Sequence, residues 1–359
     1  MNANNDLVLE VNDLRTTFLT PRGPVGAVDG VSMSLRAGET LGIVGESGSG
    51  KSVLGRTVMG LIADNPTTRV SGEVRIGGHD VHAITPRERR RLWGPEVAMV
   101  FQDPMTSLNP VKKVGTHITE ALRLHLKLDK AEAHARAVEL LRQVFIPEAE
   151  RRMRQYPHEL SGGMRQRVVI AMALACDPKL LIADEPTTAL DVTVQKQILD
   201  LLATLAAERN MATILISHDL GAVEGRTDRV AVMYAGRTVE TSRTSRVFHA
   251  PEHPYAEALL ASIPRLDDDP HTVLRAIEGT PPNLLNPPVG CRFAPRCRFT
   301  VDRCRTEDPA LRELGDATGA THLAACHFPL VASGDRAAES SAGEPANAAA
   351  TASPTQEVN

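Results

Sequence analysis

The fold is set by Gly45-Glu46-Ser47-Gly48-Ser49-Gly50-Lys51-Ser52, which has the spacing G-x-x-x-x-G-K-S of a phosphate-binding loop. The apolar run 40–44 before it predicts a buried strand, and the run 53–62 after it has helical spacing. Between a strand and a helix, the glycines let backbone N–H groups turn towards phosphate oxygens, and the helix N-terminus adds a positive dipole end. We therefore expect all eight residues to bind a nucleotide.

Two acidic residues complete the expected nucleotide site. Lys51 would reach the β- and γ-phosphates as a point charge, and the Ser52 hydroxyl would bind Mg²⁺. The apolar run 180–183 predicts a strand that ends at Asp184 and Glu185. We expect Asp184 to hold Mg²⁺ through a water molecule and Glu185 to orient and polarise the attacking water.

Composition indicates a soluble globular protein of 359 residues, with 42% hydrophobic and 23% charged residues. The net charge of −4 disfavours a nucleic-acid partner. No apolar run approaches the ~20 residues of a membrane span, and the N-terminus lacks the pattern of a secretory signal. These features predict a cytosolic chain with reduced thiols.

Strands alternate with helices, which predicts a largely parallel α/β sheet. Candidate functional residues follow the ends of predicted strands, where ligands of such sheets bind: Lys51, Gln102, Asp184 and His218. We expect a nucleotide-binding domain over 1–250 with a helical part at about 103–165. A cysteine-containing region over 251–330 and a disordered tail over 331–359, rich in Ala, Ser, Glu and Pro, would follow.

A second glycine-rich helix start occurs at Leu160-Ser161-Gly162-Gly163. It predicts another anion-binding helix N-terminus. One nucleotide needs only one phosphate loop, so we expect Ser161, Gly162 and Gly163 to contact the γ-phosphate of a nucleotide held by another subunit.

Together these motifs resemble the ATP-binding cassette (ABC) ATPases over roughly residues 7–250. The resemblance implies a P-loop NTPase fold, with a mixed sheet, a RecA-like core and a helical subdomain. It implies that Gln102 senses Mg²⁺ and the γ-phosphate, and that His218 contacts the γ-phosphate. Residues 189–191 match the D-loop of these ATPases. The expected catalytic residues are then Glu185, His218 and Gln102. The expected Mg²⁺ ligands are Ser52, Gln102 and Asp184.

A narrower resemblance is to the ATPase subunits of bacterial oligopeptide and dipeptide importers, carried by residues 101–110, 185–195 and 253–327. It implies a peripheral protein on the cytoplasmic face of the membrane that hydrolyses ATP to energise peptide import. The implied partners are a second, different ATPase subunit, two integral membrane subunits and an extracytoplasmic substrate-binding protein.

Alternative functions are also open. Related nickel and antimicrobial-peptide transporters share the same features. A soluble cassette protein acting on nucleic acid or ribosomes is disfavoured by the acidic net charge and by the importer-like segment after Gln102. A non-catalytic regulatory binder is disfavoured by the intact Lys51, Asp184, Glu185 and His218.

The sequence offers two candidate residues for the adenine contact. Cassette ATPases usually stack adenine on an aromatic residue before the second strand, and Phe18 is the nearest aromatic. Arg22 competes for this role, and Phe18 also suits a core position.

Four of the five cysteines cluster near the C-terminus: Cys291, Cys297, Cys304 and Cys326. Four thiolates suit Zn²⁺ or an iron–sulfur cluster. The spacing lacks the C-x₂-C pairs of common zinc sites, which favours a [4Fe–4S] cluster, and the importer family carries a similar cysteine set. The alternative is that these are structural cysteines, as we expect for Cys176 in an apolar helical run.

Overall fold

The computed structural model describes residues 7–188, 190–263, 277–314 and 321–330. The predicted tail over 331–359 and Ala189 of the expected D-loop lie outside the described residues.

The larger sheet has eight strands in the order β11-β12-β10-β9-β3-β8-β7-β6. Its centre is parallel, as predicted, and comprises β3 (Thr40–Val44), β8 (Ala212–Ser217), β7 (Leu180–Asp184) and β6 (Val97–Val100). These strands are rich in Val, Ile and Leu because both faces of the sheet are covered. Beside β3, β9 (Arg229–Tyr234) runs parallel to it and forms the predicted hairpin with β10 (Arg237–Arg243).

A second, antiparallel sheet packs beside the first, in the order β2-β1-β4-β5. Its strands are β1 (Leu7–Thr20), β2 (Gly23–Arg36), β4 (Thr68–Ile76) and β5 (His79–Asp80). Polar and apolar residues alternate over 7–14 and predict a strand there, but β1 continues to Thr20, because bulges after Val11 and Leu14 interrupt the alternation without ending the strand. Helix α1 (Lys51–Val58) shares one hydrophobic cluster with both sheets.

The helical insert shares one hydrophobic cluster with the larger sheet. It contains α3 (Pro104–Ser107), α4 (Val114–His125), α5 (Lys130–Gln143), α6 (Ala149–Arg152) and α7 (Gly162–Ala173). Ile118, Leu122 and Leu141 are fully buried between these helices, as their spacing predicts. Helix α5 begins with a capping box, in which Asp129 and Glu132 exchange hydrogen bonds with each other's backbone.

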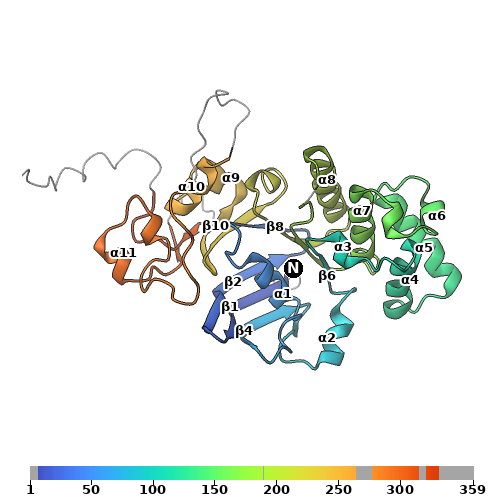
Figure 1. The fold of residues 1–359 in the computed structure, drawn as a ribbon, viewed down its shortest axis with the longest axis horizontal. Coiled ribbons are helices and arrows are strands. Elements are labelled where there is room, and N and C mark those ends of the chain that lie inside the picture. Colours follow the sequence, from blue (N-terminus) through green and yellow to red (C-terminus); the bar gives the residue numbers. More distant parts are fainter. Residues whose placement is uncertain (1–6, 189, 264–276, 315–320, 331–359) are drawn as a thin grey trace, which may run out of the picture.

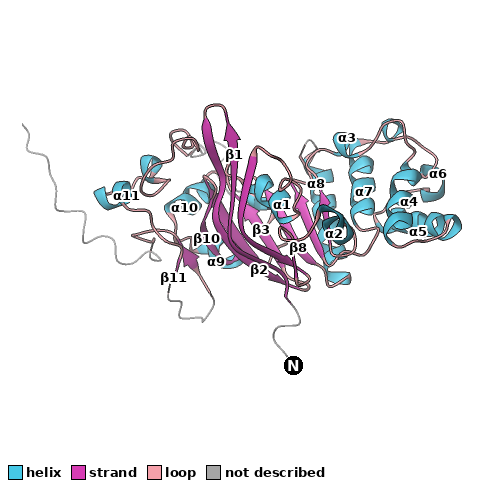
Figure 2. Ribbon diagram, turned by 90° about the horizontal axis from the view of Figure 1, so that it is seen from below, coloured by secondary structure: helices cyan, strands magenta, loops and turns pink. Residues whose placement is uncertain are grey.

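The remaining elements are helices and short strands: α2 (Pro86–Leu92), α8 (Val192–Glu208), α9 (Thr244–His249), α10 (Pro254–Ala261), α11 (Asp302–Thr306), β11 (Arg312–Glu313) and β12 (Leu323–Ala324). The helical insert and the C-terminal region that carries α11 lie at opposite ends of the molecule, with the sheets between them (Figures 1 and 2). None of the helices in the described ranges has both the length and the apolar character of a bilayer span.

The C-terminal region is built onto the sheet. Strand β12 pairs with β10, and the fully buried Glu240 accepts hydrogen bonds from the N–H groups of Glu252 and His253 and lies 2.8 Å from Nε2 of His322. Asp29 of β2 pairs with three arginines: Arg15 of β1, Arg237 of β10 and Arg292 of the C-terminal region. Charged and backbone groups therefore join this region to both sheets.

Candidate nucleotide-binding site

An open cavity of about 430 Å³ lies where β3, β7 and β8 end and α1 begins. Its lining combines segments far apart in the sequence: Ala27, Ser47, Gly48, Gly50, Lys51, Ser52, Val53, Gln102, Glu185, Thr188 and His218. The structure thus brings together the later part of the phosphate loop, from Ser47 to Ser52, and the three predicted catalytic residues. Because this is the carboxyl edge of the parallel strands, the strand ends themselves aim these side chains into one space.

Two glycines of the phosphate loop are required by its shape. Gly45 and Gly50 have φ angles of +150° and +102°, which favour glycine. A Cβ at Gly45 would lie 2.1 Å from the carbonyl oxygen of Met233, and one at Gly50 would lie 2.2 Å from that of Ala27. The loop therefore passes so close to neighbouring backbone that no side chain fits at these positions.

Lys51 lies inside the loop, with only 4% of the residue exposed. Its ammonium group donates to the carbonyl oxygens of Gly45 at 2.7 Å and Glu46 at 3.0 Å. Burial lowers the pKa of Lys51, and the nearby carboxylates of Glu185, Asp184 and Glu46 oppose that shift. A triphosphate would add negative charge beside this cation and favour its charged form.

Asp184 and Ser52 form the part of the site that suits a divalent cation. Ser52 Oγ donates to Asp184 Oδ1 at 2.7 Å, and Asp184 is fully buried. Its other oxygen, Oδ2, is buried and has no hydrogen-bond partner among the described residues. Burial raises the pKa of Asp184, since the carboxylate lies away from water. An unpartnered carboxylate oxygen beside a hydroxyl is a donor set that fits Mg²⁺.

Three side chains converge on one oxygen of Glu185. Its Oε2 accepts from Gln102 Nε2 at 2.8 Å and from Thr188 Oγ1 at 3.0 Å, and lies 3.2 Å from Nδ1 of His218. The Glu185 backbone has φ of +47°, a sparsely populated conformation for a residue with a side chain. Such strain is typical of sites where neighbouring contacts fix a functional side chain.

Thr188 was not among the predicted site residues. It lies three residues after Glu185, a spacing at which a hydroxyl can return to the carboxylate, so Glu185-Pro186-Thr187-Thr188 carried a local signal. Glu46, like Gly45 and Ser49, is not among the described residues that line the cavity. Its carboxylate pairs instead with Arg296 of the C-terminal region.

Ser161, Gly162 and Gly163 lie apart from this cavity. Ser161 is the N-cap of α7, and its hydroxyl accepts from the N–H of Met164 at 3.3 Å. A Cβ on Gly163 would lie 2.8 Å from the side chain of Val194, so this helix start packs against α8. None of these three is among the described residues that line the cavity.

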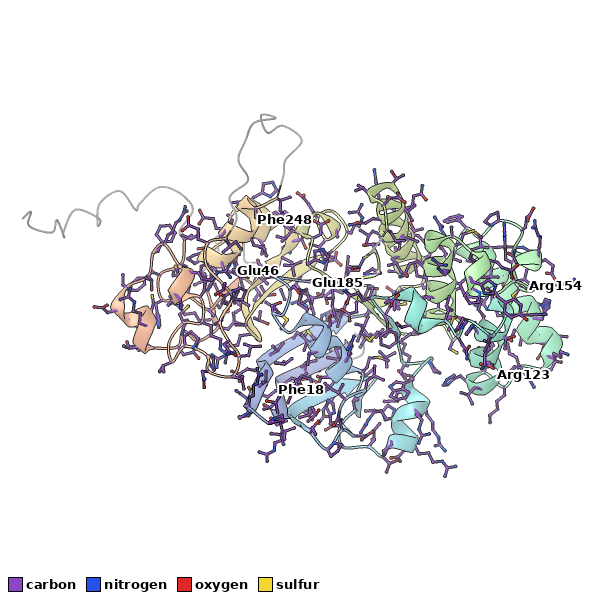
Figure 3. All side chains as sticks on the ribbon, in the orientation of Figure 1. Phe18, Glu46, Arg123, Arg154, Glu185 and Phe248 are labelled. Carbon is purple, nitrogen blue, oxygen red and sulfur yellow. The ribbon has the colours of Figure 1, made fainter. Side chains whose placement is uncertain are left out.

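Phe18 also lies outside the lining of the cavity. It is half-buried on β1, paired with Val25 of β2 and Thr68 of β4. Figure 3 shows it on the antiparallel sheet, away from Glu46 and Glu185, which both lie nearer the middle of the molecule. Arg22 is exposed in the turn between β1 and β2.

The four clustered cysteines line a single pocket together with aromatic side chains. Its cysteines come from three parts of the C-terminal region, and the other lining residues include His253, Phe293, Phe299 and Phe328. Burial raises the pKa of Cys326 to about 11 and also raises that of Cys291. No three His, Cys, Asp or Glu side chains in the described ranges are placed to share one metal ion.

Two family models match the chain. The ABC transporter model covers residues 28–188, and the model of the oligopeptide/dipeptide transporter C-terminal region covers residues 239–304. The first contains the phosphate loop, Gln102, Ser161 and Glu185, and the second contains the first three of the clustered cysteines.

Individual proteins and structures agree with these models. The oligopeptide transport ATP-binding protein OppD of Salmonella typhimurium is 52% identical over 90% of this chain and 95% of its own length. The dipeptide transport ATP-binding protein DppD of Escherichia coli is 49% identical over 90% of this chain and 97% of its own length. The dimeric structure of the bacterial ABC transporter cassette MJ0796 covers 66% of this chain and 98% of its own, with 27% identity and a TM-score of 0.59. The same cassette has been solved as a dimer in a post-hydrolysis state bound to ADP and phosphate. This chain therefore belongs to the ABC transporter family and, within it, to the oligopeptide and dipeptide transport ATP-binding proteins.

Proposed function

We propose that this chain hydrolyses ATP to energise the import of di- or oligopeptides through a membrane ABC transporter. The observation that carries the proposal is the single cavity that joins the phosphate loop to Glu185, Gln102 and His218. The peptide cargo is supported by relatives about half identical over most of the chain, whose names specify oligopeptide or dipeptide transport.

In this proposal the phosphate loop and Lys51 hold the β- and γ-phosphates. Ser52, Asp184 and Gln102 hold Mg²⁺, which when bound neutralises charge on the phosphate oxygens. Glu185 accepts a hydrogen bond from the water that attacks the γ-phosphorus, and the bond to the β-bridging oxygen breaks to leave ADP and phosphate. The side chain of His218 is 57% exposed, so it can turn from Glu185 to the γ-phosphate.

We further propose that the site is completed by a second ATPase subunit, with Ser161, Gly162 and Gly163 serving the partner's ATP. The position of Ser161 away from the cavity of its own chain supports this arrangement, as does the dimeric state of the structurally similar cassette. ATP then bridges the two subunits, and hydrolysis lets them separate. The partner ATPase in this proposal is a different chain.

For the adenine of the ATP held by this chain, the proposed contact is stacking on Phe18.

The other proposed partners are two membrane subunits and an extracytoplasmic substrate-binding protein, with this chain peripheral at the cytoplasmic face. The names of the relatives, which describe ATP-binding components of transport systems, support this assembly.

For the cysteine pocket we propose a [4Fe–4S] cluster held by Cys291, Cys297, Cys304 and Cys326. Support comes from the four thiols lining one pocket and from their sequence spacing, which lacks the C-x₂-C pairs of common zinc sites.

Replacing Asp184 by Asn tests the cation site. The folded-state pKa of Asp184 is raised, so above its unfolded pKa the buried charge opposes folding. We expect Asp184→Asn to raise the melting temperature of the nucleotide-free protein by roughly 2 °C and to abolish the further rise with Mg²⁺ and ATP. The exposed Asp200→Asn is the control. A lower melting temperature, or retained Mg²⁺-dependent stabilisation, would contradict the assignment.

Replacing Glu185 by Gln tests the proposed reaction and cargo. We expect purified Glu185→Gln to bind ATP with unchanged affinity but to lose at least ~100-fold in hydrolysis, because the amide accepts the water's proton poorly. Cells that depend on this chain and its membrane subunits should then stop taking up a labelled tripeptide. The exposed Glu224→Gln should leave both activities intact. Normal turnover would refute the role of Glu185, and uptake of nickel instead of peptide would refute the cargo.

The cluster makes a prediction that is independent of ATPase activity. Protein purified without oxygen should be brown, with broad absorption in the visible blue and about four irons per chain. Changing any one of the four clustered cysteines to Ser should remove the colour, whereas Cys176→Ser should not. A colourless protein with stoichiometric zinc would overturn the cluster.

A further inference from the structure

The second residue of the phosphate loop is held by the C-terminal region. The carboxylate of Glu46 accepts from Arg296 Nη1 at 2.7 Å and from Nη2 at 3.0 Å, through its two different oxygens. Such a two-bonded pair fixes orientation as well as charge. The Arg296 side chain is 3% exposed and that of Glu46 is 26% exposed, so the pair is largely shielded from water. Figure 3 shows Glu46 near the middle of the molecule, beside this region.

Arg296 is itself fixed on its other sides. Its Nε donates to the carbonyl of Glu278 at 2.9 Å, and Nη2 donates to that of Ile277 at 3.1 Å. Its Nη1 also donates to the hydroxyl of Tyr234 at 3.3 Å. The hydrogen bond to Glu46 raises the pKa of Arg296, so the guanidinium remains charged at any physiological pH. The position of this cation is therefore set by the C-terminal region and not by the loop.

A second contact holds the backbone of Glu46. Its N–H donates to the hydroxyl of Tyr255 at 2.8 Å. Tyr255 belongs to α10 and is fully buried, with its ring 4.5 Å from that of Tyr234 and 5.4 Å from that of Phe293. One N–H of the phosphate loop is thus bound by an aromatic cluster and is not available to a phosphate.

The charge on Glu46 would disfavour a triphosphate if it were unpaired. Glu46 is adjacent to the loop residues that line the cavity, and its carboxylate is near enough to Lys51 to oppose the lowering of that lysine's pKa by burial. Two negative groups this close repel each other, and the repulsion is strongest where water is excluded. Arg296 supplies the opposite charge at the position where it is needed.

We propose that Arg296 and Tyr255 are positioning residues of the ATP site. Arg296 neutralises Glu46, and together with Tyr255 it holds the start of the phosphate loop in the shape that receives a triphosphate. The inference rests on the proposed ATP site. It makes the C-terminal region a determinant of nucleotide affinity. Arg296 directly precedes Cys297 and ends the 3₁₀ turn Ala294–Arg296. This turn therefore contacts the phosphate loop through Arg296 and leads directly into the cysteine pocket.

The test is the dissociation constant of a fluorescent ATP analogue with Mg²⁺, measured on the full chain. Arg296→Met should weaken binding about tenfold, because Glu46 is left as an uncompensated charge beside the phosphates. Glu46→Gln added to Arg296→Met should restore binding to within about threefold of the unaltered chain, because it removes that charge. Arg298→Met, two residues along and exposed, should have no effect.

Two further variants separate positioning from folding. Arg296→Lys keeps the charge and loses the two-bonded geometry, so its affinity for the analogue should lie between those of the unaltered chain and Arg296→Met. If Arg296→Met does not fold, the folded Arg296→Lys should still bind more weakly than the unaltered chain. Tyr255→Phe removes only the hydroxyl and should weaken ATP binding about threefold. Unchanged affinity in the folded Arg296 variants, or a loss that Glu46→Gln does not restore, would overturn the proposal. Failure of the unaltered chain to bind the analogue would overturn the ATP site itself, and this proposal with it.

Discussion

The buried ammonium of Lys51 is the point at which three parts of the chain meet. Three carboxylates surround it and oppose the effect of burial on its pKa: Glu185, Asp184 and Glu46. Asp184 is fixed by the end of β7 and by Ser52. Glu185 is fixed by Gln102, Thr188 and His218, and Glu46 by Arg296 and Tyr255. A cation held among acids supplied by separate segments makes the geometry of the whole site depend on all of those segments.

This arrangement suggests how a phosphate group affects distant elements. Gln102 lies two residues after the end of β6 and leads into the helical insert, and Thr188 lies before α8. Both bind the same oxygen of Glu185. A γ-phosphate that draws Gln102 or His218 away from Glu185 would therefore shift the connections to two elements at once. The C-terminal region acts at the start of the loop, through Glu46.

Much of this site was predictable because local patterns encode it. The phosphate loop, the strand before Asp184 and the helix start at Ser161 each follow from a few consecutive residues, and the parallel sheet follows from their alternation. Glu46 and Arg296 are 250 residues apart, so no periodicity or motif predicts their pairing. The full length of β1 does not follow from the sequence either, because bulges disrupt the alternation on which strand prediction depends. In the sequence, Tyr255 resembles an ordinary core aromatic residue. Its contact with the loop arises only from the position of α10 in the fold.

The central claim is that Lys51 and Ser161 of one chain serve two different ATP molecules. It is tested most directly by the ATP affinity of the isolated Glu185→Gln chain, with and without Ser161→Arg. If Ser161 acts on the partner's nucleotide, the dissociation constant of the isolated chain should be the same in both, while ATP-dependent association with the second ATPase subunit should be lost. A loss of about tenfold in the affinity of the isolated chain would place Ser161 on its own nucleotide and contradict the account.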